Sequence, residues 1–135
     1  MALQFSVAVR NAMLDAIETT IGTSAVLKIR TGAPPASVAT ADSGTVLATL
    51  TLPSDWMAAA SSGSKAKSGT WEDASADAAG TAAHYRIYAS DGTTAHLQGT
   101  VTATGGGGDL TVDNVVFAAG QSFTVTSYSW TAANS

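Results

Sequence analysis

Two histidines, His84 and His96, are the side chains of this sequence best suited to bind a metal ion or transfer a proton near neutral pH. They lie on either side of Asp91-Gly92, a dipeptide typical of a two-residue type I′ turn between antiparallel strands. In that register the two imidazoles lie on opposite faces of the hairpin and cannot share one zinc ion or one proton, whereas a longer loop would change which side chains share a face. We therefore expect no catalytic residue and no metal site there.

Acidic side chains are the next candidates for chemistry. Glu72, Asp73 and Asp77 lie within six positions, and Asp109 and Asp113 flank a predicted strand. A calcium loop needs a denser, ordered series of oxygen ligands, and no spacing here indicates the carboxylate pair of a glycosidase. The glycine run at 105–108 lacks the Lys and Ser/Thr of a phosphate-binding loop, and no G-x-S-x-G motif is present. The sequence therefore predicts no enzyme and no cofactor.

The composition restricts the fold and the partners. Ala, Gly, Ser and Thr occupy 74 of the 135 positions, and Leu, Ile, Val and Phe only 25, so the core must be thin. The net charge of −4 offers no basic surface for nucleic acid, and the absence of cysteine excludes disulfides and thiol chemistry. The first 22 residues include Gln4, Arg10 and Asp15, which interrupt any signal or membrane-spanning segment. We expect neither nucleic acid nor membrane as a partner.

Residues 1–22 have the 3.6-residue period of an amphipathic helix, with Ser6 as its N-cap and Gly22 as its stop. The predicted apolar face consists of Phe5, Val9, Ala12, Met13, Ala16, Ile17, Thr20 and Ile21. Two interpretations are open. The face packs on an open sheet of the same chain, or the helix is an arm that lies on a neighbouring subunit.

The rest of the chain has the two-residue alternation of short strands, at 25–31, 45–52, 85–89, 95–101, 110–117 and 121–130, with an edge strand near 70–72. The loop between the first two strands holds Pro34 and Pro35; a short helical turn is expected after Ser54 or Asp55, followed by an exposed loop with Lys65 and Lys67. We predict a mainly β single domain, 1–135, with a helix at 1–22 and a jelly-roll-like β-sandwich at 23–135.

Three tryptophans and three tyrosines can contribute much of the apolar area of so thin a core. The alternative is that they gather on one exposed face, where they would suit a sugar or a protein partner. The six residues are Trp56, Trp71, Tyr85, Tyr88, Tyr128 and Trp130.

Three segments carry a family resemblance: AVRNAMLDAIETTIGTSAVLKIRTGAPPA, TVLATLTLPSDWM and HYRIYASDGTTAHLQGTV. With them, nearly the whole chain resembles a group of small proteins encoded among the virion-structure genes of tailed bacteriophages and prophages. The resemblance implies a component of the virus particle, assembled in the cytoplasm of the bacterial host. It carries no catalytic signature and assigns no site residues.

The residue patterns and the family resemblance together predict a non-enzymatic structural protein that forms homo-oligomers and binds the major capsid protein or other virion proteins. The first expectation is a capsid cement or decoration protein, which stabilises the lattice through many weak contacts. The alternative is a tail- or fibre-associated adsorption module that binds host glycan. The expected interface residues are Phe5, Val9, Met13, Ile17, Pro34, Pro35, Lys65 and Lys67.

Overall fold

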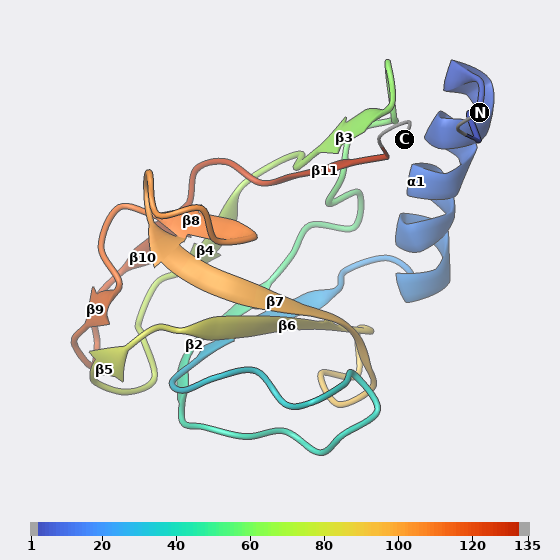
Figure 1. Ribbon diagram of the computed structural model, residues 1–135. Helices are drawn as coiled ribbons and strands as arrows, with labels where there is room; N and C mark the ends of the chain where they lie inside the picture. The colour runs from blue at the N-terminus through green and yellow to red at the C-terminus, as the bar shows by residue number, and fades with distance from the viewer. Residues whose placement is uncertain (1–2, 133–135) are drawn as a thin grey trace.

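The computed structural model describes residues 3–132 and has a mainly β fold with one helix, as the sequence predicts (Figure 1). The helix is α1 (Val7–Ile21). The strands within the described residues are β1 (Val26–Arg30), β2 (Val46–Thr51), β3 (Ser64–Ala66), β4 (Trp71–Asp73), β5 (Gly80–Thr81), β6 (His84–Tyr88), β7 (Ala95–Ala103), β8 (Leu110–Val112), β9 (Val116–Phe117), β10 (Phe123–Val125) and β11 (Ser129–Thr131).

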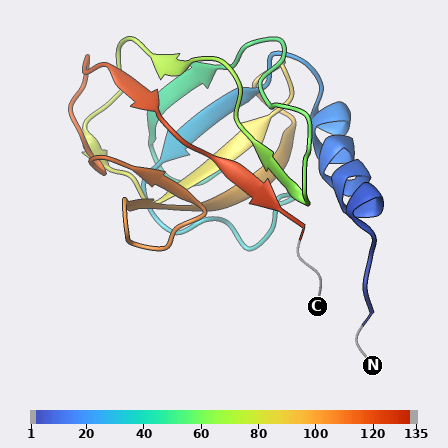
Figure 2. The same ribbon diagram turned by 90° about the horizontal axis from the view of Figure 1, so that it is seen from above.

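The main sheet has five strands in the order β2-β1-β6-β7-β8. Neighbouring strands of this sheet are antiparallel, except for β7 and β8, which are parallel to each other. Three smaller pairs, β10-β4, β11-β3 and β5-β9, complete the strands of the described region. The helix lies at one margin of the molecule in both views (Figures 1 and 2). The jelly-roll-like sandwich remains a prediction.

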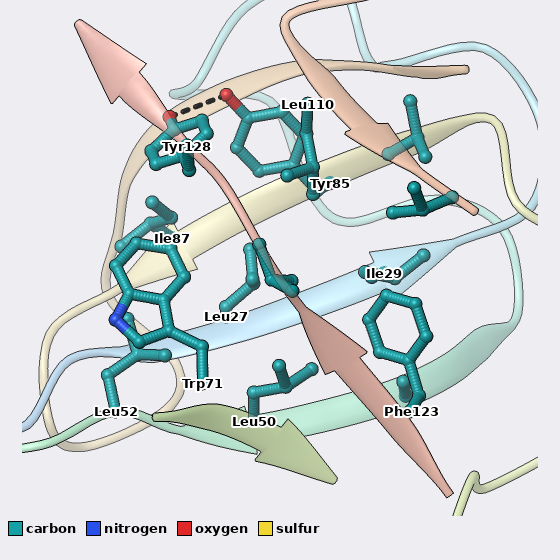
Figure 3. Close-up of a cluster of buried hydrophobic side chains, with 14 of the residues drawn as sticks. Leu27, Ile29, Leu50, Leu52, Trp71, Tyr85, Ile87, Leu110, Phe123 and Tyr128 are labelled. Atoms are coloured by element: carbon teal, nitrogen blue, oxygen red, sulfur yellow. Dashed lines mark hydrogen bonds between the residues drawn. The ribbon is translucent and has the colours of Figure 1, made fainter. Parts of the chain in front are cut away.

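The core fills the inner side of the main sheet. Leu27 and Ile29 of β1 and Leu50 of β2 are fully buried, because alternate residues of a strand point to the same face. Aromatic side chains from the smaller strand pairs and the segment before β11 cover them: Trp71, Phe123 and Tyr128 (Figure 3). The hydroxyls of Tyr85 and Tyr128 are hydrogen-bonded at 2.7 Å, so the polar atoms of these buried rings are satisfied (Figure 3). The interpretation of the aromatics as core residues is confirmed for these side chains.

The β6–β7 hairpin is confirmed, but its predicted turn and register are wrong. A two-residue turn places Tyr88 opposite Ala95 and His84 opposite Gly99. Tyr88 does face Ala95, but the register then shifts by one residue, so His84 faces Thr100. The turn is a wider loop closed by the bond from the N–H of Ala89 to the carbonyl of Thr94. Asp91 accepts hydrogen bonds from the amides of residues 93 and 94, which stabilises this wider loop.

The segment 53–69 differs most from its prediction. It contains no helical turn after Ser54 or Asp55. Trp56 is buried instead, and its indole N–H donates to the carbonyl of Gly22 at 2.8 Å. Lys65 lies on strand β3 and its side chain is only 2% exposed, so the prediction of an exposed loop is wrong there. The pairing of β3 with β11 joins segments far apart in sequence, which alternation alone cannot predict.

The bounds of the helix and of other strands also differ from the predicted ones. The helix is capped by Ser6 and Gly22 as predicted, but it begins at Val7, after the extended residues 3–6; positions 1 and 2 of the predicted 1–22 helix lie outside the described residues. The strands expected at 110–117 and 121–130 are each interrupted and form four short strands, β8 to β11. Short strands with intervening turns allow the chain to curl around a small core.

Candidate functional site

The helix is attached to the body through its polar side. The buried ammonium of Lys65 lies 2.7 Å from a carboxylate oxygen of Asp15 and 3.4 Å from one of Glu18. The amide of Ala60 donates to Asp15 at 3.1 Å. Near the start of the helix, the guanidinium of Arg10 donates to the carbonyl of Ala132 at 3.2 Å. These bonds orient the charged side chains of α1 toward the body.

Apolar packing adds to this attachment at two places only in the described helix, because Leu14 and Ile21 are its only buried residues. The side-chain amide oxygen of Asn11 also accepts from the amide of Gly63, which lies in the turn before β3. The hydrogen bonds of Asp15 to Lys65 and Ala60 hold its pKa below the usual value. The attachment is therefore polar in most of its contacts and strongest near the middle of the helix.

The apolar side of the helix faces away from the body. Val9, Met13 and Ile17 are 44%, 48% and 36% exposed, although each is a large apolar side chain. Between and beside them lie three exposed alanines, Ala8, Ala12 and Ala16. We call these six residues the outward helix face. The interpretation that the apolar face packs on the chain's own sheet is wrong for Val9, Met13 and Ile17, because the polar contacts of the opposite side determine how the helix is rotated. Ile21, at the end of the predicted face, does pack into the core.

Two shallow hollows border the outward helix face. One, of about 300 Å³, is lined by Met13, Ala16, Ile17, Thr20, Ile21 and His96. The other, of about 390 Å³, lies between the helix and the strands; its lining includes Leu14, Ile17, Leu97 and Trp130. The uncharged surface of the helix is thus continued by recesses on both sides of Ile17, of which the second also has polar lining residues, among them Gln98 and Asp109.

A second polar cluster lies on the outer side of the main sheet. The carboxylate of Asp42 is 3.0 Å from the guanidinium of Arg30 and 2.9 Å from that of Arg86. The hydroxyl of Tyr88 donates to the same carboxylate at 2.7 Å. Both arginines are almost completely buried, and Asp42 belongs to the loop of residues 31–45 that covers them. We call this segment the covering loop.

The covering loop is held by its backbone as well. Its carbonyl groups at Ser37 and Pro35 accept hydrogen bonds from Arg86 and Gln98, at 3.0 and 2.8 Å. Burial would raise the pKa of Asp42, but the hydrogen bond from Tyr88 and the charges of Arg30 and Arg86 outweigh it and lower the pKa. The loop therefore stays closed through charged and hydrogen-bonded contacts and is part of the folded body.

The structure separates the predicted interface residues into groups. Val9, Met13 and Ile17 share the outward helix face, and Phe5 precedes them with 41% exposure. Pro34 and Pro35 are half-buried in the covering loop, at the other side of the sheet. Lys67 is half-buried and donates to the carbonyl of Gly69 at 2.7 Å. Lys65 is not an interface residue, because its charge is used inside the molecule to attach the helix.

The two histidines lie in different surroundings. His84 is fully buried, and its Nδ1 lies 2.6 Å from the carbonyl oxygen of Gly32 in the covering loop. His96 is exposed at the hollow beside the helix. Among residues 3–132, no three His, Cys, Asp or Glu side chains are grouped so that they could hold a metal ion. In the same range, the single helix is too short and too polar to cross a bilayer.

Sequence reasoning did not identify the contacts that attach the helix and the loop. Arg10, Asn11, Asp15 and Glu18 fall on the polar side of the predicted helix, but nothing in the sequence indicates that this side meets the body. Their partner Lys65 gives no local signal. Asp42 is the one acidic residue in the covering loop, and Arg30 and Arg86 each alternate with apolar residues in a predicted strand. The sequence does not indicate that these three side chains meet. No protein family, curated protein or solved structure compared with this chain matches it.

Proposed function

We propose that this chain is a non-enzymatic structural protein of a tailed-phage particle that forms homo-oligomers and stabilises the capsid lattice as a cement or decoration protein. One observation carries the proposal. The helix is fixed to the body by ion pairs and hydrogen bonds, and this arrangement leaves Val9, Met13 and Ile17 exposed. Exposed apolar surface on a rigid element favours contact with another protein.

The resemblance to virion-structure proteins supplies the context of this surface. In a particle the chain would be surrounded by many copies of itself and of the capsid protein. Each contact through the outward helix face is small, but contacts repeated on a lattice add up through a high effective concentration. The covering loop, with Pro34 and Pro35, lies across the sheet and offers a second contact surface for the capsid protein.

The description of the body as a β-sandwich belongs to the same proposal. Its support is the layer formed by β4 and β10, whose Trp71 and Phe123 side chains cover the inner face of the main sheet (Figure 3). A two-layer body is compact enough to lie on a capsid while the helix remains at its margin. An experimental structure of the assembled protein would test the layer arrangement directly.

The adsorption module, with exposed aromatic rings that stack on a host glycan, finds less support. Trp56 and Trp71 are both fully buried, and Tyr85 and Tyr88 are buried in the main sheet. Trp130 is half-buried against the ring of Tyr128. Rings inside the core cannot stack on a sugar, so we propose no glycan-binding function.

The copy number in the particle tests the proposal. Cryo-EM of the intact phage should show density for this chain at positions that repeat with the capsomers, and purified capsids that lack it should bind it saturably. A dozen or fewer copies per particle would instead place the protein in the tail. Ile17→Glu should weaken capsid binding, whereas Val116→Glu, at a residue 58% exposed on β9, should not. Equal capsid binding by both variants would contradict the assigned surface.

A further inference from the structure

We propose that the outward helix face binds the same face of a second copy of this chain, which forms a two-fold symmetric pair of α1 helices. This inference rests on the proposed function in one respect: it takes the helix face to be a protein interface, and it names the partner. The argument uses the shape, the charge and the position of the face.

The shape of the face is self-complementary. Val9, Met13 and Ile17 lie four residues apart, so they form a ridge along the helix surface. Ala8, Ala12 and Ala16 form the neighbouring row with the same spacing, and their small side chains leave a groove. A two-fold axis places the ridge of each helix in the alanine groove of the other. Packing between rows of this kind gives a crossing angle of about −50°.

The charge of the face permits two identical copies to meet. Identical charged surfaces repel each other, but the charged residues of α1 within the described helix are Arg10, Asp15 and Glu18, and all three have partners in the body. The outward helix face itself carries no ionisable side chain. A basic face, which an anionic membrane surface or a nucleic acid would need, is therefore absent from this side of the helix.

The position of the helix leaves room for a second molecule. In both views α1 lies at the margin of the molecule, and its outer side faces away from the main sheet (Figures 1 and 2). The exposed Val116 lies on β9, at the opposite end from the helix (Figure 1). Two copies can therefore approach helix to helix without contact between their sheets, and Val116 provides a matched apolar control outside the interface.

The size of the face predicts a weak pair. A helix of 15 residues is about 22 Å long, and one of its faces is smaller than the roughly 800 Å² that each partner of a stable complex buries. We therefore expect a concentration-dependent dimer with a dissociation constant in the range of about 1 to 100 μM. Such a pair is too weak to persist in dilute solution but is effective on a lattice.

Sedimentation equilibrium of the full chain over this concentration range tests the dimer. Wild type and Val116→Glu should dimerise equally, whereas Met13→Glu should raise the dissociation constant at least about tenfold, because it buries a carboxylate against apolar side chains. Ala12→Phe distinguishes shape complementarity from non-specific apolar attraction. It adds apolar surface but fills the alanine groove, so it should also weaken the dimer. Tighter association of Ala12→Phe would overturn the ridge-and-groove geometry.

The absence of native cysteine allows a second, independent test. Ala12 lies near the middle of the face, where a two-fold axis brings each residue close to its own equivalent. Ala12→Cys should therefore form a disulfide-linked dimer under mild oxidation, since a disulfide needs Cα atoms about 4.4 to 6.8 Å apart. Val116→Cys should remain monomeric under the same conditions. Equal crosslinking of the two variants would contradict the pairing.

Two other outcomes would assign the face to another partner and overturn the pairing, and a third would separate the pairing from the proposed function. A chain that stays monomeric throughout the range, but loses capsid binding on Met13→Glu, would leave the proposed function intact and assign the face to the capsid protein. A monomer that binds vesicles of phosphatidylcholine and phosphatidylglycerol, and loses this on Met13→Glu, would assign the face to lipid. A dimer that fails to bind capsids would leave the pairing intact and contradict the proposed function.

Discussion

The two faces of the main sheet are both buried, but by different chemistry. On the inner face, Leu27 and Ile29 pack against aromatic rings. On the outer face, the guanidinium groups of Arg30 and Arg86 are buried beneath the covering loop, where Asp42 pairs with both. The first arrangement is stabilised by burial of apolar area, and the second by ion pairs and hydrogen bonds.

This difference shows how a chain with few large aliphatic residues forms a folded body. The available large apolar side chains are concentrated on one side of one sheet. The other side is covered by an irregular loop whose backbone carbonyls and one carboxylate accept hydrogen bonds from Arg86 and Gln98 of the sheet. The same chemistry attaches the helix, through Lys65, so the outward helix face is left for a partner. Perturbation of each region should therefore have a distinct signature.

The largest effect is expected on the inner face. Trp71 is fully buried, and its indole N–H donates to the carbonyls of Trp56 and Ser68, both at 3.2 Å. Trp71→Ala should destabilise the protein by about 3 to 5 kcal/mol, because it leaves a large cavity in a small core. Urea denaturation followed by circular dichroism measures the loss. Trp71→Phe, which fills part of the space, should cost less; equal losses would show that packing of the ring is not the cause.

The outer face should respond less, because its key carboxylate is 37% exposed. Asp42→Ala leaves two buried guanidinium groups without their counter-charge and should cost about 2 kcal/mol, less than a fully buried pair. Limited proteolysis should show faster cleavage in the covering loop. Ser43→Ala, at the exposed neighbouring position, is the matched control and should leave stability and proteolysis unchanged. An unchanged Asp42→Ala protein would mean that the loop is held by its backbone bonds alone.

The sequence predicts the inner face better than the outer one, for a physical reason. Alternation of Leu27 and Ile29 with Lys28 and Arg30 identifies the apolar face of a strand, and the structure confirms it. The same alternation predicts that the polar face meets water, but Arg30 is 7% exposed. Whether a loop covers the polar face of a strand depends on residues outside that strand, here Asp42. The alternation within the strand cannot predict such contacts.

The helix shows the same limit. Its caps, Ser6 and Gly22, follow from local chemistry and are confirmed. Its rotation is determined by Lys65, a residue 47 or more positions away in sequence, so the side that packs on the body could not be predicted from amphipathicity. The sequence predicts that Val9, Met13 and Ile17 belong to an interface. That these side chains are exposed follows only from the contacts that the polar side of the helix makes with the body.

A smaller, local effect is expected at the attachment of the helix. Lys65→Met keeps the length of the side chain but removes the ammonium that pairs with Asp15 and Glu18. Amide hydrogen exchange of residues 7–21 should become faster while exchange of β1 and β6 is unchanged, because the helix contributes only two buried side chains. Lys67→Met is the matched control. Faster exchange throughout the sheet would show that the helix is an integral part of the core.

The smallest effect is a pH dependence of the unfolding free energy that is expected for the outer face of the sheet but not for the inner face. The pKa of Asp42 in the folded protein is below its usual value because Tyr88 and two arginines outweigh the effect of burial. The stability from this depressed pKa is therefore present above about pH 4, where the unfolded carboxylate is ionised, and is lost as the pH falls through the folded pKa. Asp42→Asn lacks this contribution, so the difference in unfolding free energy between wild type and Asp42→Asn should narrow below about pH 4, whereas the loss caused by Trp71→Phe should not depend on pH. A difference for Asp42→Asn that stays constant down to pH 2 would show that the covering loop is held by hydrogen-bond geometry and not by the charge of Asp42.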